Sequence, residues 1–489
     1  MAVSPDSISG CVTFMDAIDQ YANDLLGRAA RAAEAFRQLG QEPVDRIVEA
    51  VYRAAWNHRV PLARMAFEET GMGVLQDKII KNSYASLLVY EDIRSRKTVG
   101  VIGDHPALGV SEVAQPRGPI LATIPVTNPT STTIFKTLIC MKTRNPVIFS
   151  PHRGARRCIR ETARILAEAA TAAGAPPDAV QSITKSQGDY VERIMRHPKL
   201  ALILATGTSS IVRTAQMSGT PTLGVGPGNV PVYVHRSADI EHAARSIVFS
   251  KTFDHSTICG SEQAIVVEPD VDRALRPLLA KAGAVFCTPG QTRALGPVCI
   301  DRERRRMKAE IVGQSAAFIA AKAGFTVPER TKILVGEPEG VGPDHPLSYE
   351  ILAPVLAYYT VDGYARAIET CEALNRWGGV GHTVGVYAND ERVVEDFAMM
   401  NAGRILVNTP SSQGAIGGTF NTLRPSLTLA CGTEAGNVST DNISTDHLLN
   451  IHRVARMRPN ERWLAKARAL STDERVDAEA IRRIYNRNW

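Results

Sequence analysis

The sequence predicts an α/β protein built on parallel sheets, and three observations support this fold class. Short apolar runs alternate with alanine-rich helical segments over residues 119–270. These runs are continuously apolar, which is typical of strands buried on both faces of a parallel sheet. The same texture returns over residues 260–410, and a chain of 489 residues is long enough for two or three domains. We therefore expect two α/β units.

The elements follow in order from the N-terminus. Apolar side chains recur near helical spacing over residues 14–39 and 43–71, and the second helix should end at Gly71-Met72-Gly73. Residues 97–126 predict strands, because apolar β-branched residues there are punctuated by Gly and Pro. In the first unit we expect strand–helix pairs at 147–149 and 155–174, 200–205 and 209–218, and 231–234 and 238–250. In the second we expect strands at 264–267, 317–319, 332–335, 355–357 and 384–387, with helices at 271–283 and 362–376.

Composition and charge argue against several classes of protein. Hydrophobic residues make up 44% and charged residues 22%, as in ordinary globular proteins. No apolar run approaches the about 20 residues that a membrane span needs, and the N-terminus has no basic segment followed by an apolar one. We therefore expect a cytoplasmic protein with no membrane partner.

The positive charge is concentrated at the C-terminus. The net charge is +6, and His452–Trp489 holds ten Lys/Arg and five Asp/Glu, a net of +5. The rest of the chain has 46 basic and 45 acidic residues, a net of +1. A nucleic-acid-binding protein should carry its basic patch within the fold, so we expect no nucleic-acid partner.

Among the cysteines, Cys259 has the most distinctive surroundings. The eight cysteines include no CxxC pair, so neither a disulfide framework nor a metal site is expected. Cys259 stands in the polar loop Ser250–Gln263, between an expected helix and an expected strand, with small neighbours that let a substrate approach its sulfur. On this context alone, a catalytic nucleophile and a buried loop cysteine are equally well supported.

Asn128 is a second candidate. It follows an apolar strand in the run Pro125-Val126-Thr127-Asn128-Pro129. It therefore stands at the carboxyl end of a parallel strand, where α/β sheets place ligands, and its amide could donate to a developing oxyanion. Taken alone, an asparagine in a turn or at a helix cap is the simpler interpretation.

Several long motifs in a fixed order decide between these readings. They are Ile124–Asn145, Phe149–His152, Leu202–Gly207, Gly224–Asn229, Ser250–Gln263, Gly379–Thr383, Arg404–Pro410 and Pro425–Gly432. With these motifs the sequence resembles the aldehyde dehydrogenase superfamily over residues 40–455. Its closest likeness is to the aldehyde dehydrogenase half of the bifunctional aldehyde–alcohol dehydrogenases.

The resemblance implies a fold and a division into domains. The aldehyde dehydrogenase fold combines a Rossmann-like cofactor domain, an α/β catalytic domain and a small β oligomerisation flap. Applied to this chain, it predicts an NAD-binding domain at 1–96 and 117–250 and a catalytic domain at 251–425. The oligomerisation strands fall at 97–116 and 426–457, a basic amphipathic tail at 458–489, and the assembly is a homodimer or homotetramer.

The resemblance also implies roles for single residues. Cys259 matches the nucleophile, and Asn128 matches the amide that, with the backbone N–H of Cys259, holds the oxyanion. Ser150 falls in the strand-end motif that lines the adenosine ribose. Gly207 and Thr208 open the helix whose N-terminus meets the cofactor pyrophosphate.

Glu350 matches the acid that binds the nicotinamide ribose, and the alternative for it is a solvated loop carboxylate. NAD is the expected cofactor, although Arg153 leaves NADP open. His255 is either a base for a thiol or a plain loop histidine, and His382 is a candidate for tuning the coenzyme A thiol.

One departure from the family pattern matters most. Hydrolytic members carry a glutamate in a Glu-Leu-Gly-Gly-Lys motif, whereas this chain reads Leu223–Asn229 with no carboxylate. A thioester at Cys259 should therefore wait for another nucleophile, as in the coenzyme A-acylating branch. The resemblance thus predicts oxidation of a short-chain aldehyde, acetaldehyde- or propionaldehyde-like, with NAD and coenzyme A.

Three alternatives stay open. They are an acylating sulfoacetaldehyde dehydrogenase, a hydrolytic aldehyde dehydrogenase that releases free acid, and a catalytically idle scaffold on the same fold. The stretch Thr433–Asn437 replaces an expected Trp-containing segment, so the acyl pocket can differ from that of an acetaldehyde enzyme. The aldehyde–alcohol enzymes also carry an iron-dependent domain, and from the length of this chain we expect no alcohol formation.

The basic tail has its own pattern. Over residues 473–489 one helical face carries apolar side chains, namely Val476, Ala480, Ile481, Ile484 and Tyr485. Such a helix either packs on its own oligomer or acts as a targeting helix. It resembles the terminal helices that direct enzymes, including acylating aldehyde dehydrogenases, into bacterial microcompartments, where a shell would be the partner.

Overall fold

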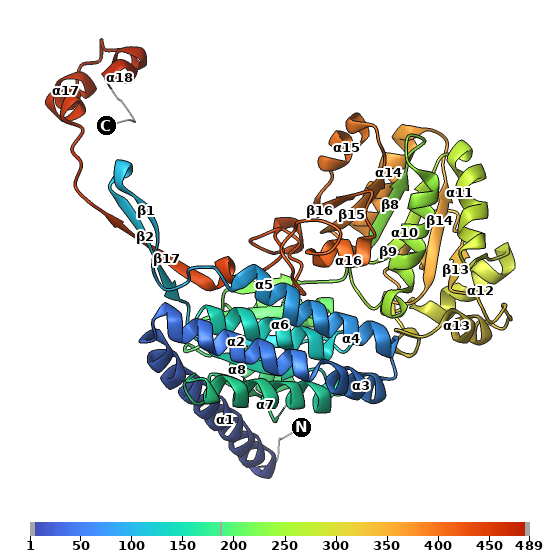
Figure 1. The fold of residues 1–489 in the computed structure, drawn as a ribbon, viewed down its shortest axis with the longest axis horizontal. Coiled ribbons are helices and arrows are strands. Elements are labelled where there is room, and N and C mark those ends of the chain that lie inside the picture. The colour runs from blue at the N-terminus through green and yellow to red at the C-terminus, as the bar shows by residue number, and fades with distance from the viewer. Residues whose placement is uncertain (1–4, 186–187, 485–489) are drawn as a thin grey trace.

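The computed structural model describes residues 5–185 and 188–484. It contains two parallel sheets with helices on both faces and a small antiparallel sheet that extends from the body (Figure 1). The predicted α/β class with two units is therefore confirmed. Among the helices of the described residues, none combines the length and the hydropathy that crossing a bilayer requires.

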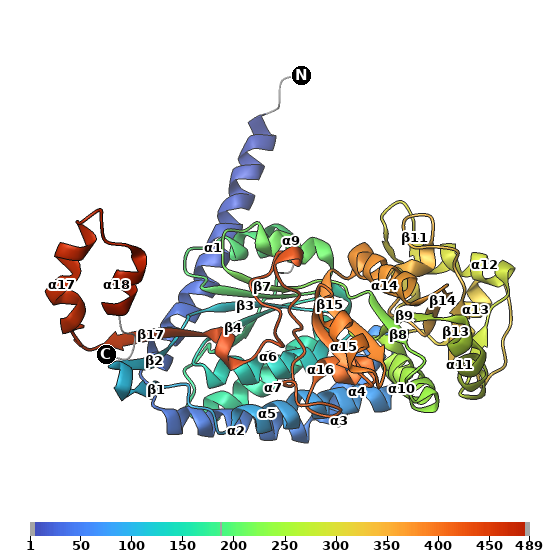
Figure 2. The ribbon, with the colours of Figure 1, turned by 90° about the horizontal axis from the view of Figure 1, so that it is seen from above.

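The first parallel sheet has five strands in the order β5-β4-β3-β6-β7. They are β3 (Ile120–Ile124), β4 (Val147–Pro151), β5 (Val180–Ser182), β6 (Leu202–Thr206) and β7 (Thr222–Val225). Successive side chains point to opposite faces, so Ile120 packs with α2 (Gln41–Asn57), α6 (Pro129–Lys142) and α7 (Arg156–Ala172). Leu121 packs on the other face with α1 (Pro5–Arg37), α8 (Gly188–Met195) and α9 (Ser209–Gln216) (Figure 2).

The second parallel sheet has seven strands in the order β10-β13-β14-β9-β8-β15-β16. They are β8 (Val230–Val234), β9 (Glu262–Val267), β10 (Ala284–Phe286), β13 (Ile333–Gly336), β14 (Val355–Thr360), β15 (Gly381–Tyr387) and β16 (Ala402–Val407). One face is covered by α10 (Ile240–Thr252) and α11 (Pro269–Lys281). The other is covered by α12 (Pro289–Cys299), α13 (Ala316–Lys322), α14 (Tyr364–Gly378) and α15 (Glu391–Ala398).

Two sequence assignments differ from this arrangement. The boundary at residue 250 placed β8 and α10 with the first unit, but β8 pairs with β9 and β15 of the second sheet. The chain crosses between the sheets earlier, in the loop 226–229 that links β7 to β8. The prediction of a strand at 317–319 was wrong, because these residues lie in α13. Ser315 caps that helix by accepting a hydrogen bond from the Phe318 N–H, and the alanine-rich run favours a helix.

The helix expected at 43–71 is divided. It breaks at His58 between α2 and α3 (Arg59–Thr70), and α3 ends at Gly71, as predicted. Gly71 adopts the left-handed conformation with φ 63°, and its N–H donates to the Phe67 carbonyl. The chain continues into α4 (Leu75–Ser83), the π-helical turn η1 (Tyr84–Leu88) and α5 (Val89–Ile93).

The antiparallel sheet joins distant parts of the chain. It comprises β1 (Gly100–His105), β2 (Val110–Pro116) and β17 (Leu449–Ala455) in the order β1-β2-β17, so strands form in both of the predicted segments. Beyond it the tail forms α17 (Glu461–Ser471) and α18 (Ala478–Ile484), which stand away from the two parallel sheets (Figure 1). Of the predicted apolar face, Tyr485 lies outside the described residues.

The remaining elements are short. They are β11 (Ile300–Asp301), β12 (Arg306–Met307), α16 (Ser411–Ile416), and the 3-10 turns η2 (Pro106–Leu108), η3 (Arg153–Ala155), η4 (Phe253–Ser256), η5 (Ala309–Ile311), η6 (Pro346–Ser348), η7 (Thr433–Ala435) and η8 (Thr445–Leu448).

Candidate active site

The carboxyl edge of the first parallel sheet gathers the residues predicted at strand ends. Asn128 follows β3, Ser150 lies near the end of β4, and Gly207 and Thr208 follow β6. Because β4 and β6 flank β3 in the sheet, these positions lie side by side along one edge. This is the edge at which parallel sheets bind ligands.

Cys259 lies in the loop that leads from η4 into β9. Its side chain is half-buried and packs beside an apolar cluster that includes Val225, Leu429 and Cys431. Burial, and then the nearby carboxylate of Glu350, raise the pKa of the Cys259 thiol to about 12. In this state of the protein the thiol is protonated, and a nucleophilic thiolate requires that a bound ligand or a base change its surroundings.

Asn128 is directly connected to the cysteine loop. Its amide nitrogen donates to the carbonyl of Thr257, two residues before Cys259, at 3.1 Å, and to the hydroxyl of Thr127, also at 3.1 Å. Its amide oxygen accepts from the ammonium of Lys81 at 2.6 Å. The Asn128 side chain, which was predicted to lie at a strand end, therefore contacts the segment that carries Cys259, the predicted nucleophile.

The backbone before Cys259 is strained. Asp254, His255 and Ser256 all have positive φ, at 48°, 49° and 63°. Consecutive residues with side chains rarely adopt this left-handed conformation, which costs about 1–2 kcal/mol per residue. Such strain persists where surrounding contacts hold it, and it is found preferentially at functional sites.

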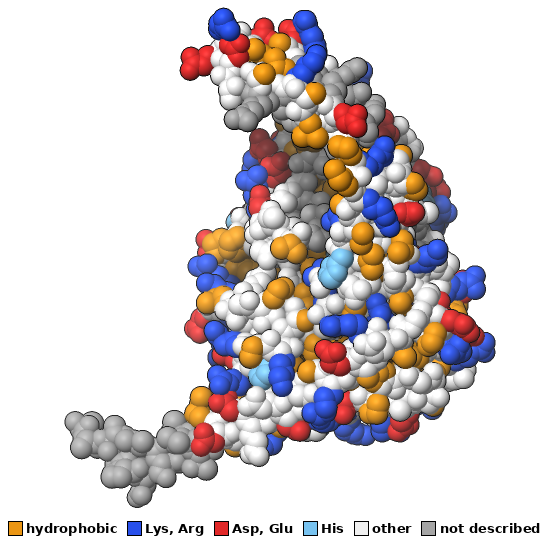
Figure 3. Space-filling view, turned by 90° about the vertical axis from the view of Figure 1, so that its left-hand side faces the viewer, with side chains coloured by type: hydrophobic (Ala, Val, Ile, Leu, Met, Phe, Trp, Pro, Cys, Tyr) orange, Lys and Arg blue, Asp and Glu red, His pale blue; other side chains and the backbone are white. Residues whose placement is uncertain are grey.

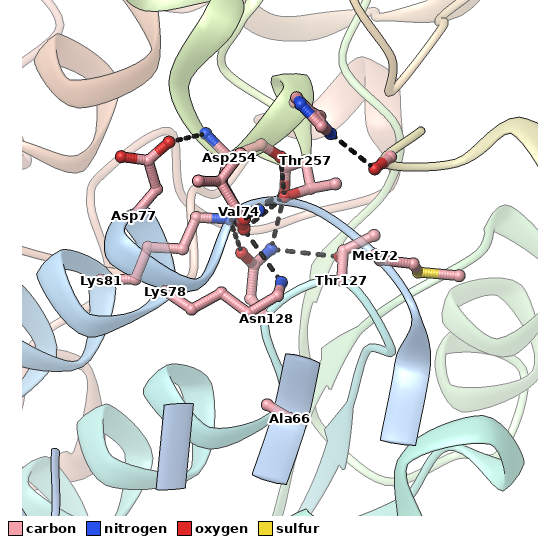
Figure 4. Close-up of polar contacts among 12 residues, drawn as sticks. Ala66, Met72, Val74, Asp77, Lys78, Lys81, Thr127, Asn128, Asp254 and Thr257 are labelled. Carbon is pink, nitrogen blue, oxygen red and sulfur yellow. Dashed lines mark hydrogen bonds and ion pairs between the residues drawn. The ribbon is translucent and has the colours of Figure 1, made fainter. Parts of the chain in front are cut away.

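The carboxylate of Asp254 is the main support of this turn (Figure 4). It is fully buried and accepts from the Val74 N–H at 2.7 Å, from Lys78 at 3.0 Å and from Lys81 at 2.5 Å. The Thr257 hydroxyl also donates to it, at 2.7 Å. Although burial opposes the charge, the two lysines keep the pKa of Asp254 below its usual value. The turn that precedes Cys259 is thus anchored to α4.

The loop between the two sheets packs directly against the cysteine. A side-chain carbon added to Gly228 would lie 2.3 Å from the Cys259 carbonyl oxygen and 3.0 Å from the ring of His382. The Gly228 N–H donates to the Glu350 carboxylate at 2.9 Å. Burial raises the pKa of Glu350 to about 7. The loop 226–229, part of the segment that lacks the glutamate of the hydrolytic members, is therefore adjacent to Cys259, the predicted nucleophile. The carboxylate of Glu350 comes from a distant segment and lies in the same site.

The two candidate histidines differ in their surroundings. The Nδ1 atom of His255 lies 3.0 Å from the Gly313 carbonyl, a contact that ties loops together and is consistent with the loop-histidine interpretation. His382 is fully buried, and its Nδ1 atom lies 2.9 Å from the Thr383 hydroxyl. Among the described residues its Nε2 atom has no partner. Burial, and then the charge of Arg404, hold the pKa of His382 well below 6.5, so the ring is neutral at pH 7.

A sequence model described as "Aldehyde dehydrogenase family" matches residues 2–426. This chain belongs to the aldehyde dehydrogenase family. The resemblance inferred from the motifs is thereby confirmed.

One curated relative of this aldehyde dehydrogenase is the bifunctional aldehyde-alcohol dehydrogenase AdhE of Escherichia coli (strain K12). It is 42% identical over 446 residues, a match that covers 90% of this chain and 50% of the relative. The chain thus spans about half the length of the first curated relatives that it matches.

Three solved structures share the fold along most of their own length. An acetylating aldehyde dehydrogenase from Geobacillus thermoglucosidasius is 42% identical with a TM-score of 0.87, covering 90% of this chain and 98% of that one. The propionaldehyde dehydrogenase of Rhodopseudomonas palustris, with bound propionyl-CoA, is 26% identical with a TM-score of 0.78, covering 89% and 94%. A propionaldehyde dehydrogenase from the Clostridium phytofermentans fucose utilisation bacterial microcompartment is 27% identical with a TM-score of 0.78, covering 89% and 97%. These matches confirm the predicted aldehyde dehydrogenase fold.

Sequence reasoning missed the charged groups beneath the site of this aldehyde dehydrogenase. Lys78 and Lys81 belong to α4, about 175 residues before the aspartate that they contact, Asp254. One signal was available, since the lysines stand three residues apart on a short amphipathic helix, but a solvated face is the ordinary interpretation of such a pattern.

Proposed function

We propose that this aldehyde dehydrogenase is coenzyme A-acylating and oxidises a short-chain aldehyde with NAD and coenzyme A to an acyl-CoA and NADH. The observation that carries the proposal is the loop between the sheets. It packs against Cys259 through Gly228 and contains no carboxylate that could activate water. A thioester on Cys259 then lacks the water-activating base of the hydrolytic members and is available to a thiol, while Glu350 is engaged by the Gly228 N–H.

The residues of the first sheet edge fit a dinucleotide. Thr208 makes no side-chain cap at the N-terminus of α9, so the first N–H groups of that helix remain available to a pyrophosphate. Ser150 offers a hydroxyl at the same edge, and Glu350 offers a carboxylate to a ribose hydroxyl on the side of Cys259. In this proposal NAD lies across the edge. Replacing NAD by NADP in the assay tests whether exposed Arg153 selects a 2′-phosphate.

The proposed reaction uses the residues in sequence. The Cys259 thiol first loses its proton to water, and the thiolate adds to the aldehyde carbon. The Asn128 amide and the Cys259 N–H donate to the resulting oxyanion. NAD, when bound, supplies the hydride acceptor. Loss of the hydride leaves an acyl thioester on Cys259. The sulfur of coenzyme A then attacks the acyl carbon, and Cys259 leaves as a thiolate.

We infer that His382 tunes the coenzyme A thiol by accepting a hydrogen bond from it. Its ring is neutral at pH 7, and its Nε2 atom has no partner within the described part of the chain. The His382 ring also lies beside Gly228, and the Cys259 carbonyl lies beside the same glycine. A neutral imidazole with a vacant nitrogen can accept such a hydrogen bond.

The surroundings of the sulfur favour an apolar substrate. Val225, Leu429 and Cys431 form the cluster against which Cys259 packs. An acetaldehyde- or propionaldehyde-like chain suits such surroundings. The sulfonate of sulfoacetaldehyde requires a cationic partner, and the cation whose charge acts on Cys259, Arg404, is already engaged by the carbonyls of His382 and Ala430.

Aldehyde-dependent NADH formation, measured with and without coenzyme A over C2–C4 aldehydes and sulfoacetaldehyde, tests the proposal. We expect continuous turnover with coenzyme A and about one NADH per Cys259 without it. Equal turnover without coenzyme A would establish the hydrolytic alternative instead. Cys259→Ala should abolish oxidation while NAD still binds, and full activity in that variant would refute the assignment.

We infer that the antiparallel sheet and the residues that follow it serve assembly. Among the described strands, β1 and β17 each have an unpaired edge. Val101 and Val454 are exposed on this sheet, and Leu108 is exposed on the turn η2 that joins β1 to β2. Hydrophobic side chains are interspersed with Lys and Arg on the face of the molecule toward the sheet and tail (Figure 3). We propose a homodimer or homotetramer joined through this sheet, which sedimentation of wild type and Leu108→Asp would test. An unchanged mass in the variant would contradict it.

The tail supports two uses. The helices α17 and α18 contact one another and stand away from the parallel sheets, with Leu464 and Met457 exposed (Figure 1). They pack on another subunit or target the cytoplasmic enzyme to a microcompartment shell, as the origin of the C. phytofermentans structure suggests. Deleting 458–489 distinguishes the two: loss of oligomer supports packing, and loss of co-purification with shells supports targeting.

A further inference from the structure

Lys81 lies between the oxyanion donor and the strained turn. It comes from α4, its side chain is 2% exposed, and its ammonium reaches atoms of three residues (Figure 4). The partners are the Asn128 amide oxygen at 2.6 Å, the Asp254 carboxylate at 2.5 Å and the Thr257 hydroxyl at 2.8 Å. One cation therefore connects the predicted donor to the loop of the predicted nucleophile.

The contact with Lys81 fixes which way the Asn128 amide faces. An ammonium has donors and no acceptor, so it can satisfy the amide oxygen but not the amide nitrogen. The amide nitrogen must then face away from Lys81, where it donates to the Thr257 carbonyl of the cysteine loop and to the hydroxyl of the neighbouring residue Thr127. Rotating the amide by 180° would place two N–H groups against a buried cation.

The same contact strengthens the amide as a donor. A positive charge on the oxygen draws electron density from the nitrogen, and a charge-assisted hydrogen bond is about twice as strong as a neutral one. The amide nitrogen lies 3.1 Å from the Thr127 hydroxyl oxygen, and the hydrogen bond between them is of the weaker kind because both groups are neutral. A substrate oxygen that develops negative charge can take over that hydrogen.

We propose that Lys81 is a positioning residue for aldehyde oxidation, which holds the Asn128 amide with its nitrogen toward the Cys259 loop and increases its strength as an oxyanion donor. The inference rests on the proposed function, in which Asn128 stabilises the oxyanion. It assigns a specific task to a lysine that lies 47 residues before Asn128 in the sequence.

The charge state of Lys81 supports this role near neutral pH. Burial lowers the pKa of Lys81 to about 8, while Asp254 and then Asp77 act in the opposite direction and Lys78 adds to the lowering. The ammonium is therefore the main form at pH 7 and is lost as the pH rises above about 8. Donation by Asn128 should weaken over the same range.

Lys81→Met, compared with Lys78→Met, tests the proposal. Both substitutions remove one buried ammonium from Asp254, but only Lys81 contacts Asn128. We measure the single-turnover rate of NADH formation without coenzyme A, so that acyl transfer does not contribute. Lys81→Met should slow this rate by about 10- to 100-fold, below the 10²- to 10³-fold loss typical when an entire oxyanion donor is removed. Lys78→Met should slow it less than about threefold.

A double-mutant cycle separates this role from simple support of the fold. If Lys81 acts through Asn128, then Lys81→Met should cause little further loss in an Asn128→Ala background. Losses that multiply in the double variant would overturn the proposal, as would equal rates in the two lysine variants. Absence of aldehyde-dependent NADH in the wild type would instead reject the proposed function.

If Lys81→Met does not fold, a second measurement carries the test. The ratio of the wild-type rate to the Asn128→Ala rate removes the pH dependence of the Cys259 thiol, which both proteins share. We expect this ratio to fall as the pH rises above about 8, where Lys81 loses its proton. A ratio that stays constant from pH 6 to pH 10 would overturn the proposal.

Discussion

Gly228→Ala should disrupt the site by a single methyl group. Gly228 does not have positive φ, so an alanine meets no backbone penalty there. Its new carbon would, however, lie 2.3 Å from the Cys259 carbonyl oxygen and 3.0 Å from the ring of His382. Contacts between a carbon and a carbonyl oxygen normally begin at about 3.3 Å. The two backbones must therefore separate by about 1 Å.

This displacement sets the expected magnitude. Overpacking a filled interior costs about 1–3 kcal/mol, so the midpoint of thermal unfolding should fall by a measurable amount. Displacement of a nucleophile by 1 Å costs about 100-fold in rate, because the reacting atoms leave their aligned positions. We therefore expect single-turnover NADH formation to slow by about two orders of magnitude, while NAD binding at the first sheet edge changes little.

The matched control for stability is Gly226→Ala. A carbon added to Gly226 meets no atom within 4 Å, so this variant should unfold at the wild-type midpoint. The assays are differential scanning calorimetry and stopped-flow NADH absorbance. A wild-type rate in Gly228→Ala would refute the reasoning, and so would an equal loss of stability in the two alanine variants.

Three further predictions follow from the contacts of the site. Alkylation of Cys259 by iodoacetamide should be slow at pH 7, and its rate should rise with pH. Glu350→Gln should accelerate the alkylation at pH 8, because the carboxylate helps to raise the pKa of the thiol. A slower reaction in the variant would show that the carboxylate does not act on the thiol. Asp254→Asn leaves two buried ammonium groups without their carboxylate, so it should lower stability by about 3–5 kcal/mol at pH 7. Because the folded-state pKa of Asp254 is depressed, its contribution is present above its usual value of 3.8 and lost as the pH falls through the lower folded value, so urea denaturation of the two proteins should converge in acid. Asn229→Ala removes the donor to the carbonyls of Ser348 and Leu374 at 2.8 and 2.7 Å, and each orphaned carbonyl should cost about 1–3 kcal/mol; a wild-type thermal midpoint in this variant would show that the carbonyls find other donors.

The candidate residues at the sheet edge were predictable because their signals are local. Asn128 became a candidate because it follows an apolar strand, whereas Ser150 and Gly207 were expected from the family resemblance. All three lie together because the carboxyl ends of parallel strands share one edge. The small residues and the polar loop around Cys259 made it a candidate, and the family resemblance then made it the predicted nucleophile. The sequence reasoning failed where an apolar run was short, as at 317–319, because periodicity over three residues cannot distinguish a strand from a helix turn.

The charged residues beneath the site could not be predicted in this way. Lys81 and Asp254 lie 173 residues apart, and no spacing rule connects them. Their burial also runs against the expectation that lysine and aspartate lie at the surface. Contact between them arises because the helices before the first sheet pack against the turn that leads into the second.

Cys259 illustrates the division between sequence and structure. The motif around it, together with the other motifs in their fixed order, was sufficient to predict the family, and the absence of a carboxylate between Leu223 and Asn229 favoured a thiol as the acyl acceptor. Its protonation state, the direction of the Asn128 amide and the contact between Glu350 and the Gly228 N–H were decided by tertiary packing. A pKa and the direction of a hydrogen bond depend on burial and on charges a few ångströms away, and those neighbours come from segments that are remote in the chain.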